Sequence, residues 1–167
     1  MNINYKNDFI NTFITNRKKS MFKADIDKYS DVLINKIKDK SVLVIGGAGT
    51  IGSSFIKAVL KFKPNKLVVV DTNENGLTEL TRDLRSENKQ FIPKDFLTYP
   101  MNFGDKVFEK MFLDLGPFNI VANFAAHKHV RSEKDIYSIE SMIENNVFKA
   151  KKFLDLLLTN KPDNFFC

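Results

Sequence analysis

Three glycines at fixed spacing, Gly46, Gly49 and Gly52, lie between an apolar run and an amphipathic one. The run over residues 42–45 is rich in β-branched residues, which suits a strand buried on both faces. From Ser53 onward, apolar residues recur at helical intervals. A strand, a glycine turn and a helix in this order present free backbone N–H groups to a phosphate. Gly46 would allow a sharp turn, Gly49 the approach of a pyrophosphate, and Gly52 close packing of helix on strand.

An acidic residue at the end of the next apolar run supports a dinucleotide site. Asp71 follows the run over residues 67–70 and lies near the separation of about 20 residues expected from the first glycine. A carboxylate there accepts hydrogen bonds from the adenosine ribose hydroxyls. It also repels a 2′-phosphate, and no Arg follows to bind one, so the sequence favours NAD over NADP. The alternative is a tight strand–helix turn whose glycines serve packing only.

Composition excludes several classes of protein. The 167 residues suffice for a single domain with a sizeable core. No apolar run approaches the roughly 18–20 residues that span a bilayer, and the N-terminus lacks a secretory pattern, so we expect no membrane span. The single cysteine, Cys167, excludes an internal disulfide and predicts a cytoplasmic protein. The net charge is +6, but the basic residues are dispersed, which predicts a solvated surface and no nucleic-acid partner.

The hydrophobic pattern divides the chain at residue 39. Residues 1–39 form a predicted helical extension, which we expect to pack on the core or on a second subunit; a partner-binding or membrane-surface role is the alternative. From residue 40 to 167 the strand and helix patterns alternate. Strands are expected at about 42–45, 66–70, 96–102 and 118–124, and helices at about 50–62, 73–86, 105–115 and 136–159. The strand at 96–102 is preferred to the competing pair at 91–92, which Pro93 interrupts.

These alternating patterns predict an α/β fold. It is a Rossmann-type doubly wound parallel sheet, truncated after the start of a fifth strand at residues 164–167.

Three segments carry a family resemblance: GGAGTIGS in the glycine turn, VVVD after it, and NFAAHKHV after the fourth strand. Together they resemble the extended short-chain dehydrogenase/reductase superfamily. Within it, AAHKHV followed by an Asn on the next helix is similar to the nucleotide-sugar 4,6-dehydratases of the capsular, CapD-like polysaccharide-biosynthesis group. The resemblance covers about residues 41–167. It implies a lyase or epimerase that binds NAD, or in some members NADP, and acts on a UDP-sugar: C4 of the hexose is oxidised, water is eliminated across C5–C6, and hydride returns to C6.

The resemblance also implies which residues bind. The pyrophosphate would be held by Gly46, Gly49, Thr50, Ile51 and Gly52. The adenosine ribose would be held by Asp71 and Asn73. The adenine would lie beside Asn102 and Phe103, where the family usually has an Asp and an apolar residue. The nicotinamide side would be lined by Ala125, Ala126 and Lys128, and the substrate approach by His129. The spacing of His127 and His129 could suggest a metal, but no further ligand supports one, so no metal site is predicted.

The chemistry expected of the family lacks its main residues here. By resemblance, the Ser/Thr-Asp-Lys element and the Tyr-x-x-x-Lys pair would fall beyond Cys167, and no tyrosine of this chain has a Lys four residues later. Without a phenolate base, hydride abstraction from a sugar hydroxyl has no proton acceptor. Asn146 either supports the active-site water and lysine, as the resemblance implies, or is an ordinary polar helix residue. We therefore expect the cofactor-binding part of an enzyme; the competing hypothesis is a non-catalytic NAD-binding or homo-oligomerising module.

Overall fold

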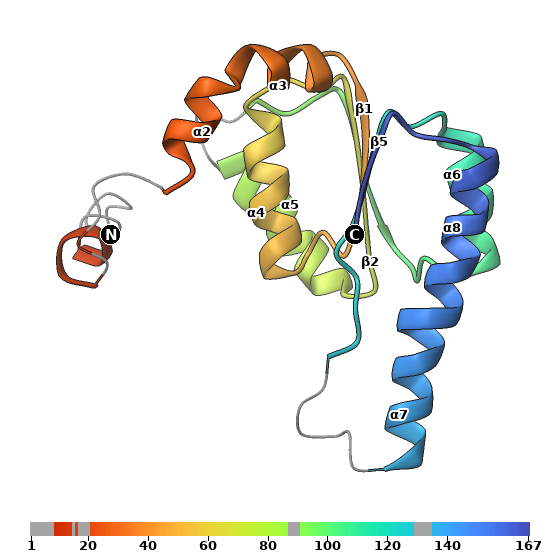
Figure 1. Ribbon diagram of the computed structural model, residues 1–167. Helices are drawn as coiled ribbons and strands as arrows, with labels where there is room; N and C mark the ends of the chain where they lie inside the picture. Colours follow the sequence, from red (N-terminus) through yellow and green to blue (C-terminus); the bar gives the residue numbers. More distant parts are fainter. Residues whose placement is uncertain (1–8, 15, 17–20, 87–90, 129–134) are drawn as a thin grey trace. The chain divides into compact units, whose positions relative to one another are not determined.

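The computed structural model describes residues 9–14, 16, 21–86, 91–128 and 135–167 (Figure 1). The chain divides into two compact units, Met1–Asn35 and Lys36–Cys167. The assignment of separate roles to residues 1–39 and 40–167 stays a prediction.

The described residues of the N-terminal unit are largely helical, as the apolar periodicity predicts. It contains the π-helical turn η1 (Ile10–Ile14), α2 (Lys23–Lys28) and most of α3 (Ser30–Ile37). Helix α2 runs into α3 because Tyr29 N–H donates to the Asp25 carbonyl at 3.0 Å and Leu33 N–H donates to the Tyr29 carbonyl at 2.9 Å. The helical pattern of this stretch thus forms two consecutive helices.

The second unit is built on a parallel sheet, which confirms the predicted fold class. Its strands are β1 (Ser41–Ile45), β2 (Lys66–Asp71), β3 (Asp95–Pro100), β4 (Ile120–Asn123) and β5 (Asn164–Phe166). Their order is β3-β2-β1-β4-β5, with every pairing parallel. The order reverses between β1 and β4, and this is where a doubly wound sheet binds its ligand, at the carboxyl ends of the strands. The third strand lies at 95–100, so the choice against residues 91–92 is confirmed.

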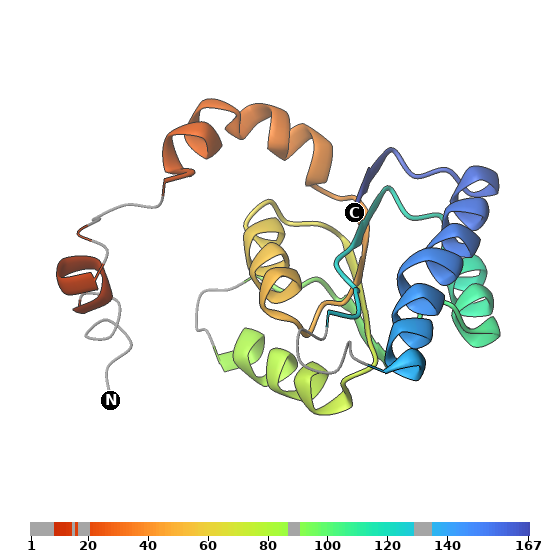
Figure 2. The ribbon, with the colours of Figure 1, turned by 60° about the horizontal axis from the view of Figure 1, so that its bottom comes forward.

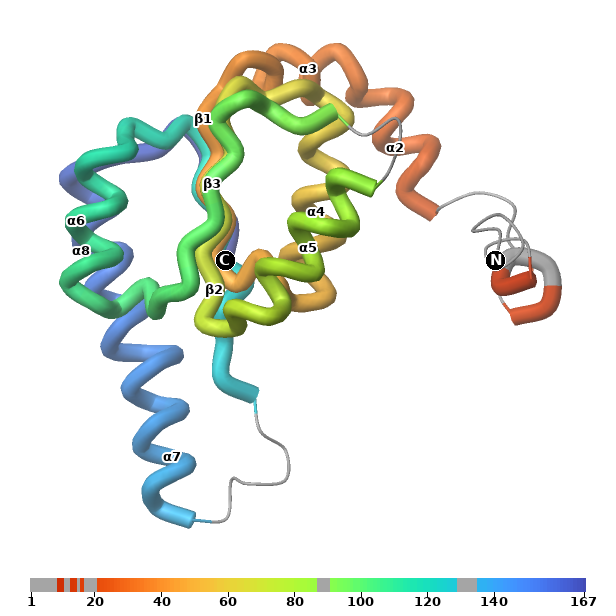
Figure 3. The backbone as a smooth tube through the Cα atoms, turned by 180° about the vertical axis from the view of Figure 1, so that it is seen from behind, coloured from red at the N-terminus to blue at the C-terminus, as the bar shows by residue number. Residues whose placement is uncertain are grey.

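Helices cover both faces of this sheet. Helices α4 (Thr50–Leu60) and α5 (Glu74–Ser86) lie on one face, and α6 (Lys106–Leu115) and α8 (Ala150–Thr159) on the other (Figures 1 and 3). The predicted long helix at 136–159 is found as α7 (Ile136–Ile143), the π-helical turn η2 (Glu144–Lys149) and α8. These three segments follow one another along a single rod (Figure 2). A π-helical turn inside an α-helix is rare and is frequently found at functional sites.

The core beneath α6 and α8 is rich in phenylalanine. Alternate residues of β1 and β2 point into it, including Leu43 and Val68, both fully buried. Phe153 of α8 lies at its centre, edge-on to Phe103 at 6.1 Å and to Phe108 at 5.5 Å between ring centroids. Such edge-to-face pairs add to the free energy that burial provides, so α8 is firmly attached to the sheet.

Among the apolar side chains of the long helix, the buried ones lie in α8. Phe153 and Leu157 are buried, whereas Ile136 of α7 is 72% exposed and Val147 of η2 is 54% exposed. Figures 1 and 3 show α7 reaching beyond the end of the sheet, which explains this difference. In the part of the chain that the structure describes, every helix is too short or too polar to cross a membrane.

Candidate cofactor-binding site

The turn between β1 and α4 requires glycine at two of its three predicted positions. Gly46 has φ = +74°, and a Cβ there would lie 2.6 Å from the backbone nitrogen of Ala125. A Cβ on Gly52 would overlap the carbonyl oxygen of Gly46. By contrast, a Cβ on Gly49 would meet only that same oxygen, at 3.4 Å. Gly46 and Gly52 are therefore required by packing, while Gly49 leaves open space on the outside of the turn.

The start of α4 offers unpaired backbone donors to that space. Gly49 is the N-cap residue and has no side chain with which to accept hydrogen bonds from the first turn. Thr50 and Ile51 form this turn with exposed side chains. The N–H groups at a helix N-terminus, together with the helix dipole, attract anionic groups. This end of α4 is thus suited to a phosphate.

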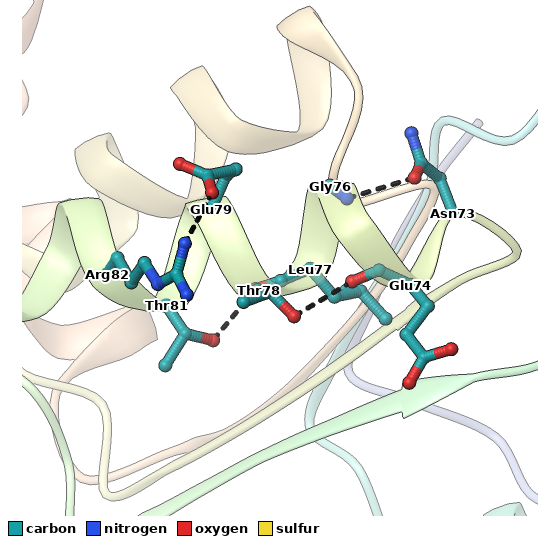
Figure 4. A network of polar contacts seen from close by, with 8 residues as sticks. All are labelled: Asn73, Glu74, Gly76, Leu77, Thr78, Glu79, Thr81 and Arg82. Atoms are coloured by element: carbon teal, nitrogen blue, oxygen red, sulfur yellow. Dashed lines mark hydrogen bonds and ion pairs between the residues drawn. The ribbon is translucent and has the colours of Figure 1, made fainter.

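Asp71 is held rigidly at the end of β2. Its Oδ2 accepts a hydrogen bond from Ala48 N–H at 2.9 Å, and its Oδ1 accepts one from Asn73 N–H at 2.9 Å. Each carboxylate oxygen has a further lone pair, so Asp71 can still accept from a ribose hydroxyl. The side chain of Asn73 caps the next helix, because its Oδ1 accepts from Gly76 N–H at 2.9 Å at the start of α5 (Figure 4).

The loops that follow β3 and β4 form the other walls of the site. Asn102 Oδ1 accepts a hydrogen bond from Gly104 N–H at 2.9 Å. The ring of Phe103 is 5% exposed and belongs to the core, so this residue closes the floor beside Asn102. Across from them, Ala125 N–H donates to the Asn123 side chain at 3.0 Å, which shapes the turn after β4.

The end of this second loop is held by the long helix. Asn146 of η2 contacts the backbone of His127 twice: Oδ1 accepts from His127 N–H, and Nδ2 donates to the His127 carbonyl, both at 2.8 Å. Asn146 therefore positions the loop after β4, a role that neither sequence interpretation included.

Beside Asn146 lies a residue that sequence reasoning missed. Asn145 is 3% exposed, accepts a hydrogen bond from Asn102 Nδ2 at 3.3 Å, and donates one from its own Nδ2 to Asn146 Oδ1 at 3.1 Å. The signal that could have found it is the Asn145–Asn146 pair in the middle of an otherwise apolar helix pattern. Two adjacent amides in such a place are costly to bury unless they are hydrogen-bonded.

These elements enclose a cleft of about 190 Å³ at the carboxyl ends of the strands. Of the predicted residues, those that line it are Gly46, Gly49, Asp71, Asn102, Phe103, Ala125 and Ala126. The predicted residues outside its lining are Thr50, Ile51, Gly52, Asn73, Lys128 and Asn146. His129 lies outside the described residues. The described part of the chain contains no group of three or more His, Cys, Asp or Glu side chains arranged to hold a metal.

A parallel sheet of this order, with a glycine turn and an acidic strand end at its switch point, defines the class of Rossmann-type dinucleotide-binding folds. The model of the family described as "Polysaccharide biosynthesis protein" matches residues 42–167, and the chain belongs to this family. The predicted resemblance to the polysaccharide-biosynthesis group is thereby confirmed.

Two curated relatives illustrate this membership. The chain is 30% identical over 131 residues to the uncharacterized membrane protein MJ1061 of Methanocaldococcus jannaschii, covering 78% of this chain and 36% of that protein. It is 29% identical over 119 residues to the probable polysaccharide biosynthesis protein EpsC of Bacillus subtilis, covering 70% of this chain and 19% of that protein. The chain thus spans about a third or less of the length of these relatives.

Solved structures share the fold. Pen from Bacillus thuringiensis superimposes with a TM-score of 0.65 and 26% identity, covering 78% of this chain and 39% of that one. WbmF from Bordetella bronchiseptica, solved in complex with NAD+ and UDP, gives a TM-score of 0.57 and 20% identity, covering 77% of this chain and 35% of that one. Because WbmF is only 20% identical to this chain, its similarity establishes the fold alone.

Proposed function

We propose that this chain is the NAD-binding part of a nucleotide-sugar 4,6-dehydratase or epimerase of surface polysaccharide biosynthesis. The observation that carries this proposal is the cleft in which Gly46, Gly49 and the fixed carboxylate of Asp71 meet at the switch point of the sheet. The family membership, the name of EpsC, and the NAD+ and UDP bound to WbmF support it.

The residues of the cleft fit a dinucleotide. The open space outside Gly49 and the backbone donors of Thr50 and Ile51 would receive the pyrophosphate. Asp71 would accept the ribose hydroxyls, with Asn102 near the adenine and the small side chains of Ala125 and Ala126 beside the nicotinamide. When bound, the nicotinamide would supply reversible hydride transfer. The residues of this chain would bind and orient it.

The geometry of Asp71 favours NAD over NADP. Two backbone N–H groups hold both oxygens of its carboxylate, so it cannot swing away from a 2′-phosphate. The negative charges of this carboxylate and of a 2′-phosphate would repel each other, so the binding of NADP would require a compensating cation. We expect NAD+ to bind more tightly than NADP+.

Titration of the 167-residue chain with NAD+ and NADP+ by calorimetry tests this proposal. NAD+ should bind with a stoichiometry of one, and NADP+ should bind at least about ten-fold more weakly, as expected for the loss of one charge-assisted hydrogen bond. The absence of NAD+ binding would refute the proposal. Incubation with NAD+ and UDP-N-acetylglucosamine should give no turnover, because none of the tyrosines has a Lys four residues later to lower the pKa of its phenol.

A second function is favoured by the exposed apolar side chains of α7 and η2. Ile136, Tyr137 and Phe148 are 72%, 79% and 59% exposed, and apolar groups gathered on one helix mark an interaction surface. A non-catalytic, homo-oligomerising NAD-binding module would use this surface. Sedimentation equilibrium and NAD+ titration separate the two functions. A defined oligomer that binds NAD+ tightly and does not turn over UDP-N-acetylglucosamine would favour the module. In either case we place the protein in the cytoplasm, where its one cysteine would stay reduced.

A further inference from the structure

Three asparagines, two of which line the cleft, form a continuous hydrogen-bonded chain. Asn102 follows β3, whereas Asn145 and Asn146 are neighbours on η2. Asn102 Nδ2 donates to Asn145 Oδ1 at 3.3 Å, and Asn145 Nδ2 donates to Asn146 Oδ1 at 3.1 Å. The chain links the loop after β3 to the loop after β4 through a side chain that is 3% exposed.

The direction of these bonds is set by backbone groups at both ends. Gly104 N–H can only donate, so the atom of Asn102 that faces it must be Oδ1. His127 N–H can only donate and the His127 carbonyl can only accept, so both atoms of the Asn146 amide are fixed. Asn145 must therefore turn its oxygen to Asn102 and its nitrogen to Asn146. A single orientation satisfies all three amides.

Further side-chain contacts join η2 and α8 to the loop after β3. A Cβ on Gly104 would overlap the side chain of Lys149, so this aliphatic chain lies directly over the glycine. Lys152 Nζ donates to the Gly104 carbonyl at 3.3 Å and pairs with Glu109 at 3.5 Å. The loop after β3 is thus held by the helix through side chains of both polar and apolar character.

From this geometry we infer that Asn145 is a positioning residue that sets the separation between the two walls of the cleft, so that one dinucleotide can contact both. The inference rests on the proposed function, because it assigns the wall after β3 to adenine and the wall after β4 to nicotinamide. Asn145 itself acts through Asn102 and Asn146. Its amide is required because only a group that accepts on one side and donates on the other completes the chain.

Asn145→Asp tests this polarity with almost no change in shape. At about pH 8 its carboxylate accepts from Asn102 but places a second acceptor against Asn146 Oδ1, which His127 prevents from rotating. We expect NAD+ to bind about ten-fold more weakly, the usual effect of an unmade buried hydrogen bond. At about pH 5.5 a protonated carboxyl can donate to Asn146 again, because burial without a donor favours the neutral form. The affinity should then return toward that of the wild type.

Asn145→Leu is the matched control. Its side chain does not titrate, so this variant should bind NAD+ weakly at both pH values. The titratable and charged groups around the site, among them Asp71, Glu109, His127, Glu144, Lys149 and Lys152, are common to both variants. The difference between the variants therefore isolates the new carboxyl. Asn160→Asp, at the exposed end of α8, controls for the added charge.

A second ligand separates positioning from a merely structural role. ADP would contact the adenosine and pyrophosphate side only, so its affinity should change by less than about two-fold in the variants that lose NAD+ affinity. Equal weakening of ADP and NAD+, or no acid recovery in Asn145→Asp, would overturn the inference. If these variants do not fold, Asn145→Ser, which is too short to reach both neighbours, should show the same difference between NAD+ and ADP.

Amide hydrogen exchange of the ligand-free protein tests the inference about Asn145 independently of the proposed function. In the ligand-free protein, Asn145→Leu should accelerate exchange of the Gly104 and His127 amides, one in each wall. If the wild-type chain binds neither NAD+ nor ADP, the proposed function is wrong, and the linkage of the two walls is then judged by this exchange alone. Unchanged exchange at either amide would overturn it.

Discussion

The carboxylate of Asp71 and the backbone of Ala48 are joined across the ends of β2 and the glycine turn. Ala48 N–H donates to Asp71 Oδ2 at 2.9 Å, while the other oxygen accepts from Asn73 N–H. The turn that would hold the pyrophosphate therefore also orients the acid that would hold the ribose. The two parts of the predicted dinucleotide site form one rigid unit.

Replacement of Asp71 by Asn should weaken NAD+ binding about ten- to hundred-fold, the range expected for loss of a charged hydrogen-bond acceptor. The amide nitrogen would also face the N–H of Ala48 or Asn73, so one donor would lose its acceptor. Calorimetric titration measures the effect, and Asp114→Asn, an exposed acid of α6, is the control. Equal affinity of wild type and Asp71→Asn would contradict the assignment of Asp71 to the ribose.

Two glycine substitutions in the same turn should separate folding from binding. Gly46→Ala places a Cβ in a left-handed conformation and against the Ala125 backbone, and should lower the free energy of unfolding by more than about 2 kcal/mol. Gly49→Ala should leave the stability nearly unchanged, because its Cβ has space and its φ is −70°. The same Cβ would occupy the space predicted for the pyrophosphate. Urea unfolding and NAD+ titration of both variants measure the contrast; NAD+ affinity that survives in Gly49→Ala would refute this placement.

The strands could be predicted from sequence because each leaves a pattern that few other structures satisfy. The run over residues 42–45 is apolar throughout, as a central parallel strand requires, and Gly46 follows it at the turn. The third strand is harder to predict, since Pro93 precedes it and Pro100 is its last residue. The strand lies at residues 95–100. Pro100 is tolerated there because β3 is an edge strand of the sheet.

The adjacent amides of Asn145 and Asn146 mark the position in the sequence, but the role of Asn145 could not be predicted, because it depends on two loops that are distant in sequence. Helical periodicity shows which residues share a face, but η2 departs from that period and places Asn145 at the cleft and Asn146 against the backbone of His127. The same limit applies to Ile136 and Val147. Both lie in the helix predicted at 136–159, and their exposure follows from where the sheet ends, which no local pattern records.

Phe153 should be among the most important residues for stability. Its ring is 2% exposed and contacts Phe103, Phe108 and Phe112. Phe153→Ala would leave a cavity and should lower the free energy of unfolding by about 3–5 kcal/mol. Phe148→Ala, on the same rod but 59% exposed, should change it by less than about 0.5 kcal/mol. Urea unfolding followed by circular dichroism compares the two, and similar midpoints for both variants would show that α8 is not anchored through this ring.

The start of α7 should depend on pH through Asp135. Its pKa lies below the ordinary 3.8 because Ser138 Oγ donates to the carboxylate at 2.6 Å, with further bonds from the N–H groups of Ser138 and Tyr137. A carboxyl whose folded pKa is depressed stabilises the helix start fully above its unfolded pKa, and this stabilisation is lost as the pH falls through the folded value. Carbon-13 NMR titration of the Asp135 carboxyl should therefore give a midpoint below 3.8, and Ser138→Ala should raise it. Exchange of the Tyr137 and Ser138 amides should accelerate over the same pH range relative to Asp135→Asn, whose side chain does not titrate. A midpoint at or above the ordinary value, or one unmoved in Ser138→Ala, would show that these bonds do not form in solution.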